Sequence, residues 1–557
     1  MTDDDHVVLS PGRHGDAMAA AVASLSTADI LGRIWHRDHT VWRPDPREID
    51  NRLGWLDAPE TMAAVAPELA GFAAEAAANG MDRCLLMGMG GSSLAPELFG
   101  RTFGGNGPLN LRVLDSTLPG AVRRAVDWAQ PERTLFVAAS KSGTTAETLS
   151  FYRYFRHLAR EALGPGAADG HFAVITDPGS PLAVEGVSRG LRRVFENDPS
   201  VGGRYSALTH FGLVPAALVG VDLPRLLDRA AAAAAASGAH ADPAMAPGAR
   251  LGAWLGSMAN SGCNKVTFLV PPEIAGLADW AEQLLAESTG KDGRGILPVV
   301  GEPRGRPADY GPDRAFVVLD LGAAEAQNTR ALAQDLAEAG HPVARLRLDD
   351  AYDIGAQFFL WEMATAVAGR VMGIHPFDQP NVEAAKALAR EMLGQYEATG
   401  RMPAGPPGAT AADAVAAFLL EDADYVTIQA YMTPDSRLDE VLRRLRGAVM
   451  RRTGRATTVG YGPRYLHSTG QLHKGDAGLG RFLMLVDTGQ PDLAIPPEDE
   501  ASSGGATFGV LTLAEAVGDY RALAAAGRAI LRLHLGPEPM ATVEAIVDTV
   551  SKVPPAP

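Results

Sequence analysis

The sequence predicts an α/β protein in which parallel strands alternate with helices over more than one domain. Short apolar runs bounded by turn residues recur along the chain, and segments with helical periodicity follow them. Two of these runs lead into loops rich in glycine, serine and threonine, as strand-to-helix turns in open α/β sheets often do. With 557 residues and 46% hydrophobic content, the chain can form several cores.

The first half predicts a helical arm followed by one α/β unit. Residues 1–80 have alanine- and leucine-rich faces and are expected to form helices. A first α/β unit is expected over 81–238, ending with an alanine-rich helix over 226–236 and a linker. Its predicted strands are Cys84–Met87, Leu111–Leu114, Leu135–Ala139 and Phe172–Ile175.

The second half predicts two further units, at 239–400 and 401–557. Glycines and prolines from Gly400 to Gly408 mark the boundary between them, and a long helix over Gln357–Met372 precedes it. The strands predicted for the second unit are Val266–Val270, Ala315–Leu319 and Val343–Leu348. Those predicted for the third are Tyr425–Gln429, Thr457–Tyr461, Phe482–Val486 and Phe508–Leu511.

The segment Ser140–Thr148 is the strongest sign of a ligand site. Its sequence, Ser-Lys-Ser-Gly-Thr-Thr-Ala-Glu-Thr, places hydroxyls and a lysine where a buried strand meets a helix start. Backbone N–H groups and the positive helix end favour an anion there. The alternative is a Ser/Thr-rich helix cap that binds nothing.

A second loop of the same kind lies upstream and favours a ligand site over a helix cap that binds nothing. Gly88-Met89-Gly90-Gly91-Ser92-Ser93 follows a strand and precedes a helix, and its glycines allow a ligand to approach the backbone. It fits neither the nucleotide P-loop nor the dinucleotide fingerprint. Two such loops on adjacent parallel strands predict one small phosphorylated ligand at the strand ends.

The composition of the chain argues against some classes of binding partner and location. A net charge of −16 argues against broad binding of nucleic acid or anionic membranes. The two cysteines, Cys84 and Cys263, fit a reducing cytoplasm and supply no metal or disulfide framework. The acidic N-terminus lacks a signal-peptide pattern, and no stretch reaches transmembrane length without charges, so a cytoplasmic protein is expected.

Five motifs, in this order, resemble glucose-6-phosphate isomerases. They are Gly90-Gly91-Ser92, Ser140–Thr145, Val201–Ser206 (Val-Gly-Gly-Arg-Tyr-Ser), Glu287–Lys291 (Glu-Ser-Thr-Gly-Lys) and Gln379–Lys386. The chain is most similar to the actinobacterial type and to the isomerase half of transaldolase–isomerase fusions. The resemblance implies two sugar isomerase (SIS) domains, each a parallel sheet flanked by helices, and a homodimer; the third α/β domain is additional.

The resemblance implies that Glu287 is the catalytic base. Aldose–ketose isomerisation moves a proton between C2 and C1 through a cis-enediol, so one base can serve both carbons. Arg204 would stabilise the enediolate, and Gln283, one helical turn before Glu287, matches a family position. The alternatives are a solvated Glu287, an Arg204 paired with Glu196 or Asp198, and a surface Gln283.

The same resemblance assigns phosphate binding and ring opening. The phosphate is expected on Ser140, Ser142, Thr145 and the Gly91–Ser92 turn, with charge from Lys141 unless it points to solvent, and with Gly203 close to the sugar. Gln379 and Lys386 match the family's Gln-to-Lys spacing, which makes Lys386 a ring-opening acid/base. An exposed helix lysine is the alternative.

Histidine departs from the family pattern. A ring-opening histidine is expected between Glu287 and Gln379, but His341 and His375, the histidines there, lie in unsuitable contexts. The third unit instead contains Leu466-His467-Ser468-Thr469-Gly470-Gln471, which resembles the family's histidine motif. We therefore expect His467 to open the ring. His473 is the second choice, and a capping or buried histidine is the alternative.

These observations predict a glucose-6-phosphate isomerase that needs no cofactor or metal. One alternative is a dual phosphoglucose/phosphomannose isomerase, which would use the same base and accept either C2 epimer. Another is a SIS-type sensor that binds sugar phosphate without turnover, which the set Glu287, Arg204 and Lys386 argues against. A Schiff-base aminosugar isomerase is disfavoured because no amidotransferase segment is present.

Overall fold

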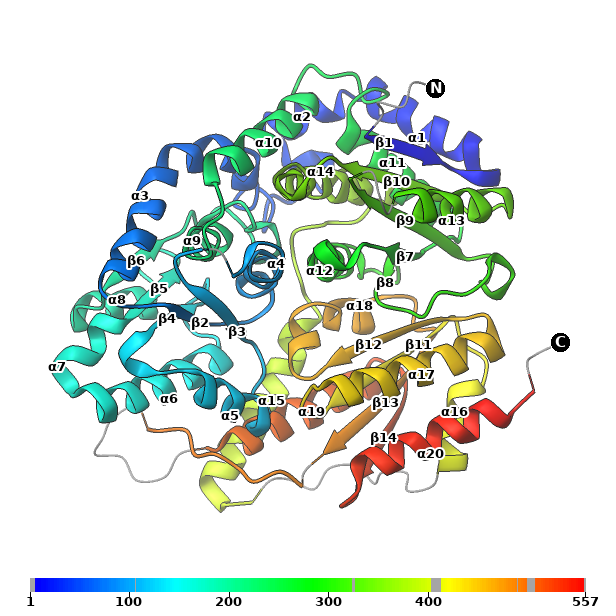
Figure 1. Cartoon of the computed structure of the whole chain (residues 1–557). Helices are drawn as coiled ribbons and strands as arrows, with labels where there is room; N and C mark the ends of the chain where they lie inside the picture. Colours follow the sequence, from blue (N-terminus) through cyan, green and yellow to red (C-terminus); the bar gives the residue numbers. More distant parts are fainter. Residues whose placement is uncertain are drawn as a thin grey trace.

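The computed structural model has the predicted α/β class, with three sheets of mainly parallel strands flanked by helices (Figure 1). It describes residues 6–105, 107–322, 326–401, 412–487, 489–497 and 506–554; the side chains of residues 326, 328, 383–386 and 397 lie outside this description. Within the described residues, none of the helices combines the length and apolarity that crossing a bilayer requires.

The first sheet has the strand order β3-β2-β4-β5-β6 and is parallel throughout. Alternate residues of β2 face opposite ways: Leu86 joins the core beneath helices α3, α4 and α9, and Leu85 joins the core beneath α5 and α6. Burial on both faces explains why the strands read as continuous apolar runs. The elements are β2 (Arg83–Gly88), β3 (Asn110–Leu114), β4 (Thr134–Ala139), β5 (Phe172–Thr176), β6 (Arg193–Glu196), α3 (Ala58–Ala78), α4 (Leu94–Phe103), α5 (Pro119–Trp128), α6 (Ala146–Leu163), α8 (Pro181–Arg189) and α9 (His210–Leu218).

The second sheet has the order β1-β10-β9-β7-β8. Here the structure corrects the helical N-terminal arm predicted over 1–80, because Val7–Ser10 forms a strand, β1, antiparallel to β10. Four residues carry too little periodicity to reveal a strand, and the free edge of β10 decides the conformation. The other elements are β7 (Lys265–Leu269), β8 (Leu297–Val299), β9 (Arg314–Leu321), β10 (Val343–Leu348), α1 (Gly15–Thr27), α2 (Ile30–Trp35), α10 (Leu223–Ala236), α11 (Pro247–Asn260), α12 (Ala275–Thr289), α13 (Ala326–Glu338) and α14 (Ile354–Met372).

The third sheet, of order β12-β11-β13-β14, is parallel throughout. The strand predicted over Phe508–Leu511 is wrong, because these residues begin helix α19, where Thr507 caps the N-terminus through Val510 N–H. A run of four apolar residues fits either state. The elements are β11 (Tyr425–Tyr431), β12 (Ala456–Tyr461), β13 (Gly480–Asp487), β14 (Ala529–Leu535), α16 (Ala412–Leu420), α17 (Ser436–Thr453), α18 (Gly470–Gly475), α19 (Phe508–Ala525) and α20 (Pro539–Lys552).

Helix α12 lies where the three sheets approach one another, between α4, α14 and α18 (Figure 1). The third domain is fixed there by buried polar groups as well as by apolar packing. Glu302 pairs with Arg314 of the second unit at 2.9 Å and accepts the N–H of Thr457 in the third at 2.7 Å. Helix α15 (Val382–Thr399) packs along α19 and connects the second and third units. The end of α12 is therefore enclosed by elements of all three units.

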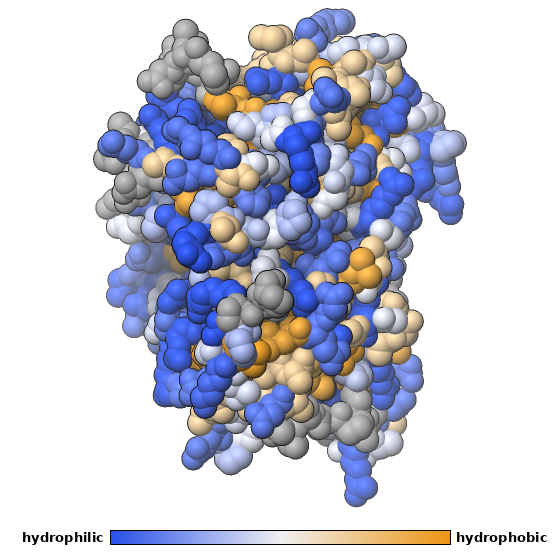
Figure 2. Space-filling view, turned by 90° about the vertical axis from the view of Figure 1, so that its right-hand side faces the viewer, coloured by the Kyte–Doolittle hydropathy of each residue, from blue (hydrophilic) through white to orange (hydrophobic). Residues whose placement is uncertain are grey.

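The outer surface is mixed in polarity. The face in Figure 2 is mainly hydrophilic, with smaller groups of apolar residues among the hydrophilic ones. This surface agrees with a sequence in which 21% of residues are charged.

Candidate active site

Glu287 and Gln283 lie one turn apart on the last part of α12. Gln283 Nε2 donates to Glu287 Oε2 at 3.0 Å and to the backbone carbonyl of His467 at 2.8 Å. The side chain of Glu287 is 13% exposed, whereas Gln283 is buried and its Oε1 has no protein partner among the described residues. One residue of α12 therefore connects the carboxylate to the third domain.

Arg204 faces Glu287 from the 3₁₀ turn Gly203–Tyr205. Its Nη1 lies 3.3 Å from Glu287 Oε1 and donates to Gln379 Oε1 at 2.8 Å, and its Nε donates to Ser288 Oγ at 2.8 Å. Its Nη2 donates to the carbonyls of Pro376 and Asp378. Arg204 thus joins α12 to the segment before α15. The alternative in which Arg204 pairs with Glu196 or Asp198 does not hold, because its partners are these other groups.

Two glycine-containing turns meet beside this arginine. A Cβ on Gly91 would lie 2.0 Å from the carbonyl oxygen of Gly203, so no side chain fits at position 91. Gly90, with φ +55°, passes close to the His467 carbonyl and Gln283 Nε2. Ser92, the last residue of this turn, is 9% exposed.

The loop Ser140–Thr145 lies at the carboxyl end of β4 and leads into α6. Ser140 and Thr145 hydroxyls are 2.9 Å apart, and those of Ser142 and Thr144 are 2.8 Å apart. The residue before α6, Thr145, makes no side-chain cap, which leaves this helix end to an anion. Lys141 turns away, because its Nζ binds Asp177 Oδ2 at 2.5 Å and the carbonyl of Pro199 at 3.0 Å.

His467 reaches the first unit from the third domain of the same chain. Its Nε2 lies 2.6 Å from Oε1 of Glu147, in the first turn of α6. Burial by itself raises the pKa of Glu147, but the opposing charge and hydrogen bond of His467 outweigh it and lower the pKa below the usual range. Sequence reasoning missed Glu147, although it lies two residues after Thr145 in the same motif.

Two further residues, which contact the segment just before α15, were not singled out from the sequence. Gln471 Nε2 donates to Gly290 O at 2.9 Å and to Asn381 Oδ1 at 2.7 Å, so the histidine motif holds α12 and α15 together. Lys291 Nζ binds Asp378 Oδ1 at 2.7 Å. Burial and then the charge of Arg204 lower the pKa of Lys291 to about 8, although Asp378 opposes them. The side chain of Lys386 lies outside the described residues; its backbone belongs to α15.

Two other histidines considered from the sequence do not pair with Glu287 or Glu147, although His375 Nε2 lies 3.9 Å from Asp378 Oδ2, close to the contacts of Arg204. His473 is buried between the rings of Tyr465 and Phe482, and neither nitrogen has a hydrogen-bond partner among the described residues. His375 binds the carbonyl of Arg47 through Nε2 and accepts from Phe377 N–H. These contacts tie both histidines to the protein core rather than to Glu287 or Glu147.

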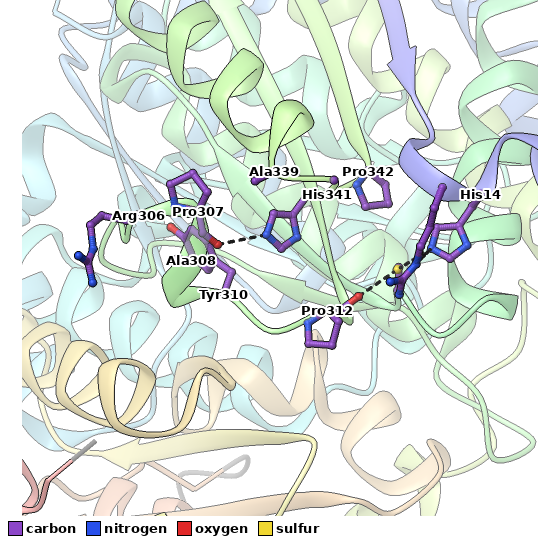
Figure 3. A pocket seen from close by; sticks show the side chains of 12 residues that line it. His14, Arg306, Pro307, Ala308, Tyr310, Pro312, Ala339, His341 and Pro342 are labelled. Carbon is purple, nitrogen blue, oxygen red and sulfur yellow. Dashed lines mark hydrogen bonds between the residues drawn. The ribbon is translucent and has the colours of Figure 1, made fainter. Parts of the chain in front are cut away.

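A hollow of ≈ 590 Å³ lies elsewhere, beside β9 and β10 (Figure 3). His341 contributes a ring that lies 3.2 Å from the carbonyl of Pro307, and His14 approaches Cys263 Sγ at 3.3 Å. Pro312 and Pro342, which also line it, precede these two strands. The hollow therefore lies at their amino ends, whereas open α/β sheets bind ligands at carboxyl ends.

The candidate site residues described above form one connected set. Hydrogen bonds and ion pairs run from Glu147 through His467, Gln283, Glu287 and Arg204 to Gln379. The set offers a carboxylate beside a fixed guanidinium, a separate histidine–carboxylate pair, and a hydroxyl-rich helix start. Such a set can move protons on a phosphorylated ligand.

Comparisons with known proteins find relatives that are named phosphoglucose or glucose-6-phosphate isomerase. A family model described as phosphoglucose isomerase matches residues 68–292. The chain is 31% identical to the glucose-6-phosphate isomerase of Rubrobacter xylanophilus, over 56% of this chain and 82% of that protein. It is 30% identical to a glucose-6-phosphate isomerase of Thermus thermophilus, over 62% of this chain and 91% of the relative.

Solved structures agree as well. A hypothetical protein from another strain of Thermus thermophilus superposes with a TM-score of 0.60 at 27% identity, covering 69% of this chain and 99% of that structure. A glucose-6-phosphate isomerase of Chlamydia trachomatis gives a TM-score of 0.58 at 20% identity, over 68% and 86% of the two chains, and so supports the fold. With relatives at 30% identity or more matched over most of their length, the chain belongs to the glucose-6-phosphate isomerase family.

Proposed function

We propose that this protein interconverts glucose 6-phosphate and fructose 6-phosphate. The observation that carries the proposal is the buried pairing of Glu287 with Arg204 at 3.3 Å, beside the loop that would hold the phosphate. A sensor needs no base opposite a fixed cation, so this pairing favours turnover over binding alone. Family membership supports the same reaction.

Glu287 would transfer the proton between C2 and C1. Its carboxylate abstracts the proton from one carbon, and the resulting negative charge on the enediolate oxygen is stabilised by Arg204. The same carboxyl then returns the proton to the other carbon, while the hydroxyl proton of O2 passes to O1, so that no net proton is gained or lost. Gln283 and Arg204 hold the carboxylate on its two oxygens, which fixes its direction.

Ring opening would belong to the His467–Glu147 pair together with Lys386. A proton must reach the ring oxygen while the anomeric hydroxyl loses one. A histidine held by a carboxylate can take either part, since the carboxylate stabilises the imidazolium. Ser140, Ser142, Thr145 and the Gly91–Ser92 turn would bind the phosphate, with Gly203 beside the sugar. Lys141, engaged by Asp177, would contribute at longer range.

We also propose a cytoplasmic homodimer. Within a single chain, His467 already pairs with Glu147 of the first unit. A dimer would therefore not be needed to bring this histidine to the site.

A coupled assay tests the function. Purified protein receives fructose 6-phosphate, glucose 6-phosphate is followed with its dehydrogenase, and mannose 6-phosphate is offered in parallel. We expect rapid turnover of fructose 6-phosphate. Binding of the sugar phosphate without turnover would replace the isomerase with a sensor, and turnover of both epimers would make the enzyme a dual isomerase.

His467→Ala tests the assignment of ring opening. Turnover of the cyclic substrate should fall about 10²-fold or more, the range in which a general acid/base acts, while exchange of the C1 or C2 hydrogen on an open-chain analogue survives. His473→Ala is the matched control from the same segment. Equal loss of both activities in His467→Ala would contradict the assignment.

A further inference from the structure

Glu515 of helix α19 lies directly behind the histidine–carboxylate pair. It is 7% exposed, and its carboxyl lies near enough to that of Glu147 for the two to form a hydrogen bond when one of them carries a proton. Its Oε2 accepts from Thr117 Oγ1 at 3.1 Å, and Thr117 Oγ1 is 2.8 Å from Thr512 Oγ1. Glu515 lies beyond residues 68–292, which the family model matches, and it belongs to none of the motifs found in the sequence.

Two carboxyls in this contact share one proton. Both cannot ionise side by side in a buried site, and a hydrogen bond between two carboxyls requires a proton on one of them. Burial and then the charge of Glu147 raise the pKa of Glu515 well above the usual range, whereas His467 lowers that of Glu147. The proton therefore belongs to Glu515.

The hydroxyls specify which oxygen carries it. Thr117 has one hydrogen and donates it to Glu515 Oε2, so Thr512 must donate to Thr117. With Oε2 accepting from Thr117, Oε1 is the oxygen left to carry the proton of a neutral Glu515. Glu515 is then a neutral acid with a defined orientation.

Neighbouring charges have partners of their own. Arg464, in the turn that leads to His467, pairs with Glu97 and with Asp115, which lies 3.3 Å away. Asp519, one turn after Glu515 on α19, pairs with Lys474 and accepts from Tyr465 at 2.6 Å. Among the described residues, the side chains that bond directly to the Glu147–Glu515 pair are thus His467 and Thr117.

We propose that Glu515 is a positioning residue for ring opening: as a neutral acid it donates a hydrogen bond to Glu147, and so holds that carboxylate ionised and directed at His467. The inference rests on the proposed role of His467. It gives the third domain two parts in one site, because α19 supplies the donor and the segment before α18 supplies the histidine.

Two substitutions distinguish a positioning role of Glu515 from a role in packing alone. Glutamine keeps an uncharged donor at position 515, whereas leucine removes it. In full-length protein with ¹³C-labelled histidine, the His467 ring should titrate in Glu515→Gln as in the wild type. In Glu515→Leu the titration midpoint of the His467 ring should rise by about one pH unit, because Glu147 no longer accepts a hydrogen bond from position 515 and its negative charge acts more strongly on His467. His467→Ala assigns the resonance.

Turnover provides the second readout. Glu515→Leu should lower kcat on cyclic substrate about tenfold and leave hydrogen exchange on an open-chain analogue unchanged, whereas Glu515→Gln stays within about twofold. Glu362→Gln is the control, because it alters a buried carboxyl of α14 whose oxygens have no hydrogen-bond partner in the described structure.

Several results would overturn the proposal. One is equal titration of His467 in the glutamine and leucine variants, and another is equal loss of kcat in both. If the leucine variant does not fold, the glutamine variant decides: replacing an ionised Glu515 would lower the His467 midpoint, and replacing a neutral one leaves it in place. The titration needs no turnover, so an inactive wild type would refute the proposed function and leave this test intact.

Discussion

At the scale of residues, the site depends on carboxyl groups whose surroundings divide them into different roles. Glu287 lies between a guanidinium and an amide, Glu147 faces an imidazole, and Glu515 keeps a proton. Sequence motifs indicated Glu287 directly, but Glu147 looked like an ordinary first-turn acid. Its partner is distant in sequence, so no local pattern could reveal it.

Glu287→Gln should abolish most turnover but should still bind the sugar phosphate. The amide oxygen can still accept from Arg204, but the NH2 group cannot accept from Gln283 and the side chain cannot take a proton from carbon, so kcat should fall by about 10²–10⁴. Glu282→Gln, on the same helix, is the matched control and should keep kcat. Steady-state kinetics and sugar-phosphate binding measure the two effects; unchanged kcat in Glu287→Gln would remove it from the mechanism.

Glu362 predicts a pH dependence of stability that does not involve the site. It is fully buried with no hydrogen-bond partner in the described structure, and burial raises its pKa well above the usual range. The folded state therefore holds this proton more tightly than the unfolded state. Its contribution to stability is complete below pH about 4.3 and is lost as pH rises toward the folded-state pKa.

Glu362→Gln removes this titration. The free energy of unfolding of the variant minus that of the wild type should increase by about 1.4 kcal/mol per pH unit above pH about 5, until the folded-state pKa is passed. Urea unfolding at several pH values measures the difference, in which the other buried acids cancel. A difference independent of pH would contradict the prediction.

At the scale of elements, the sequence located strands by their buried apolar runs and erred where runs were short or only partly buried. Val343–Leu348 is the strand β10 as predicted, whereas β1, β6 and β8, with three or four residues each, were missed. The seven-residue edge strand β14 was missed as well, because several of its residues are only half-buried. Phe508–Leu511 was assigned to the wrong state because a capping threonine, rather than apolarity, determines its helix. Tertiary contacts settle such segments.

The contact between the two glycine turns yields a prediction at this scale. Gly91→Ala would drive a Cβ into the backbone of Gly203, so the turns must separate, at a cost of about 1–3 kcal/mol, and kcat/KM should fall as Arg204 moves. Gly71→Ala, in α3 with no atom within 4 Å of the added Cβ, is the control. It should gain up to about 1 kcal/mol from helix propensity. Thermal unfolding and kinetics compare the two, and an active, stable Gly91→Ala would contradict the close contact.

At the scale of the whole molecule, the third domain completes a site that the first two units begin. The family resemblance indicated a moved histidine motif, but it could not indicate where the third domain packs. Long-range pairs decide that position: Glu302 binds Thr457, and Arg464 binds Asp115. Such pairs join residues with no common local pattern, so only the folded structure brings them together.

Mixing two inactive variants tests whether each chain holds a complete site. If His467 served a neighbouring chain, mixing Glu287→Gln with His467→Ala under exchange would create sites with both groups intact, and activity would return. Because His467 contacts Glu147 of its own chain, we expect the mixture to show the mean of the two variants. Tagged subunits that co-purify confirm exchange, and restored activity would contradict a site within one chain.

The short strand β1 ties the beginning of the chain to β10, across the whole of the first unit. During synthesis Val7–Ser10 is made before the first sheet, yet its partner Val343–Leu346 is made only after the first sheet and most of the second. The first sheet can therefore assemble while this strand is still unpaired. Its docking covers the exposed edge of the second sheet, so a strand made before the first unit pairs only after that unit has been made.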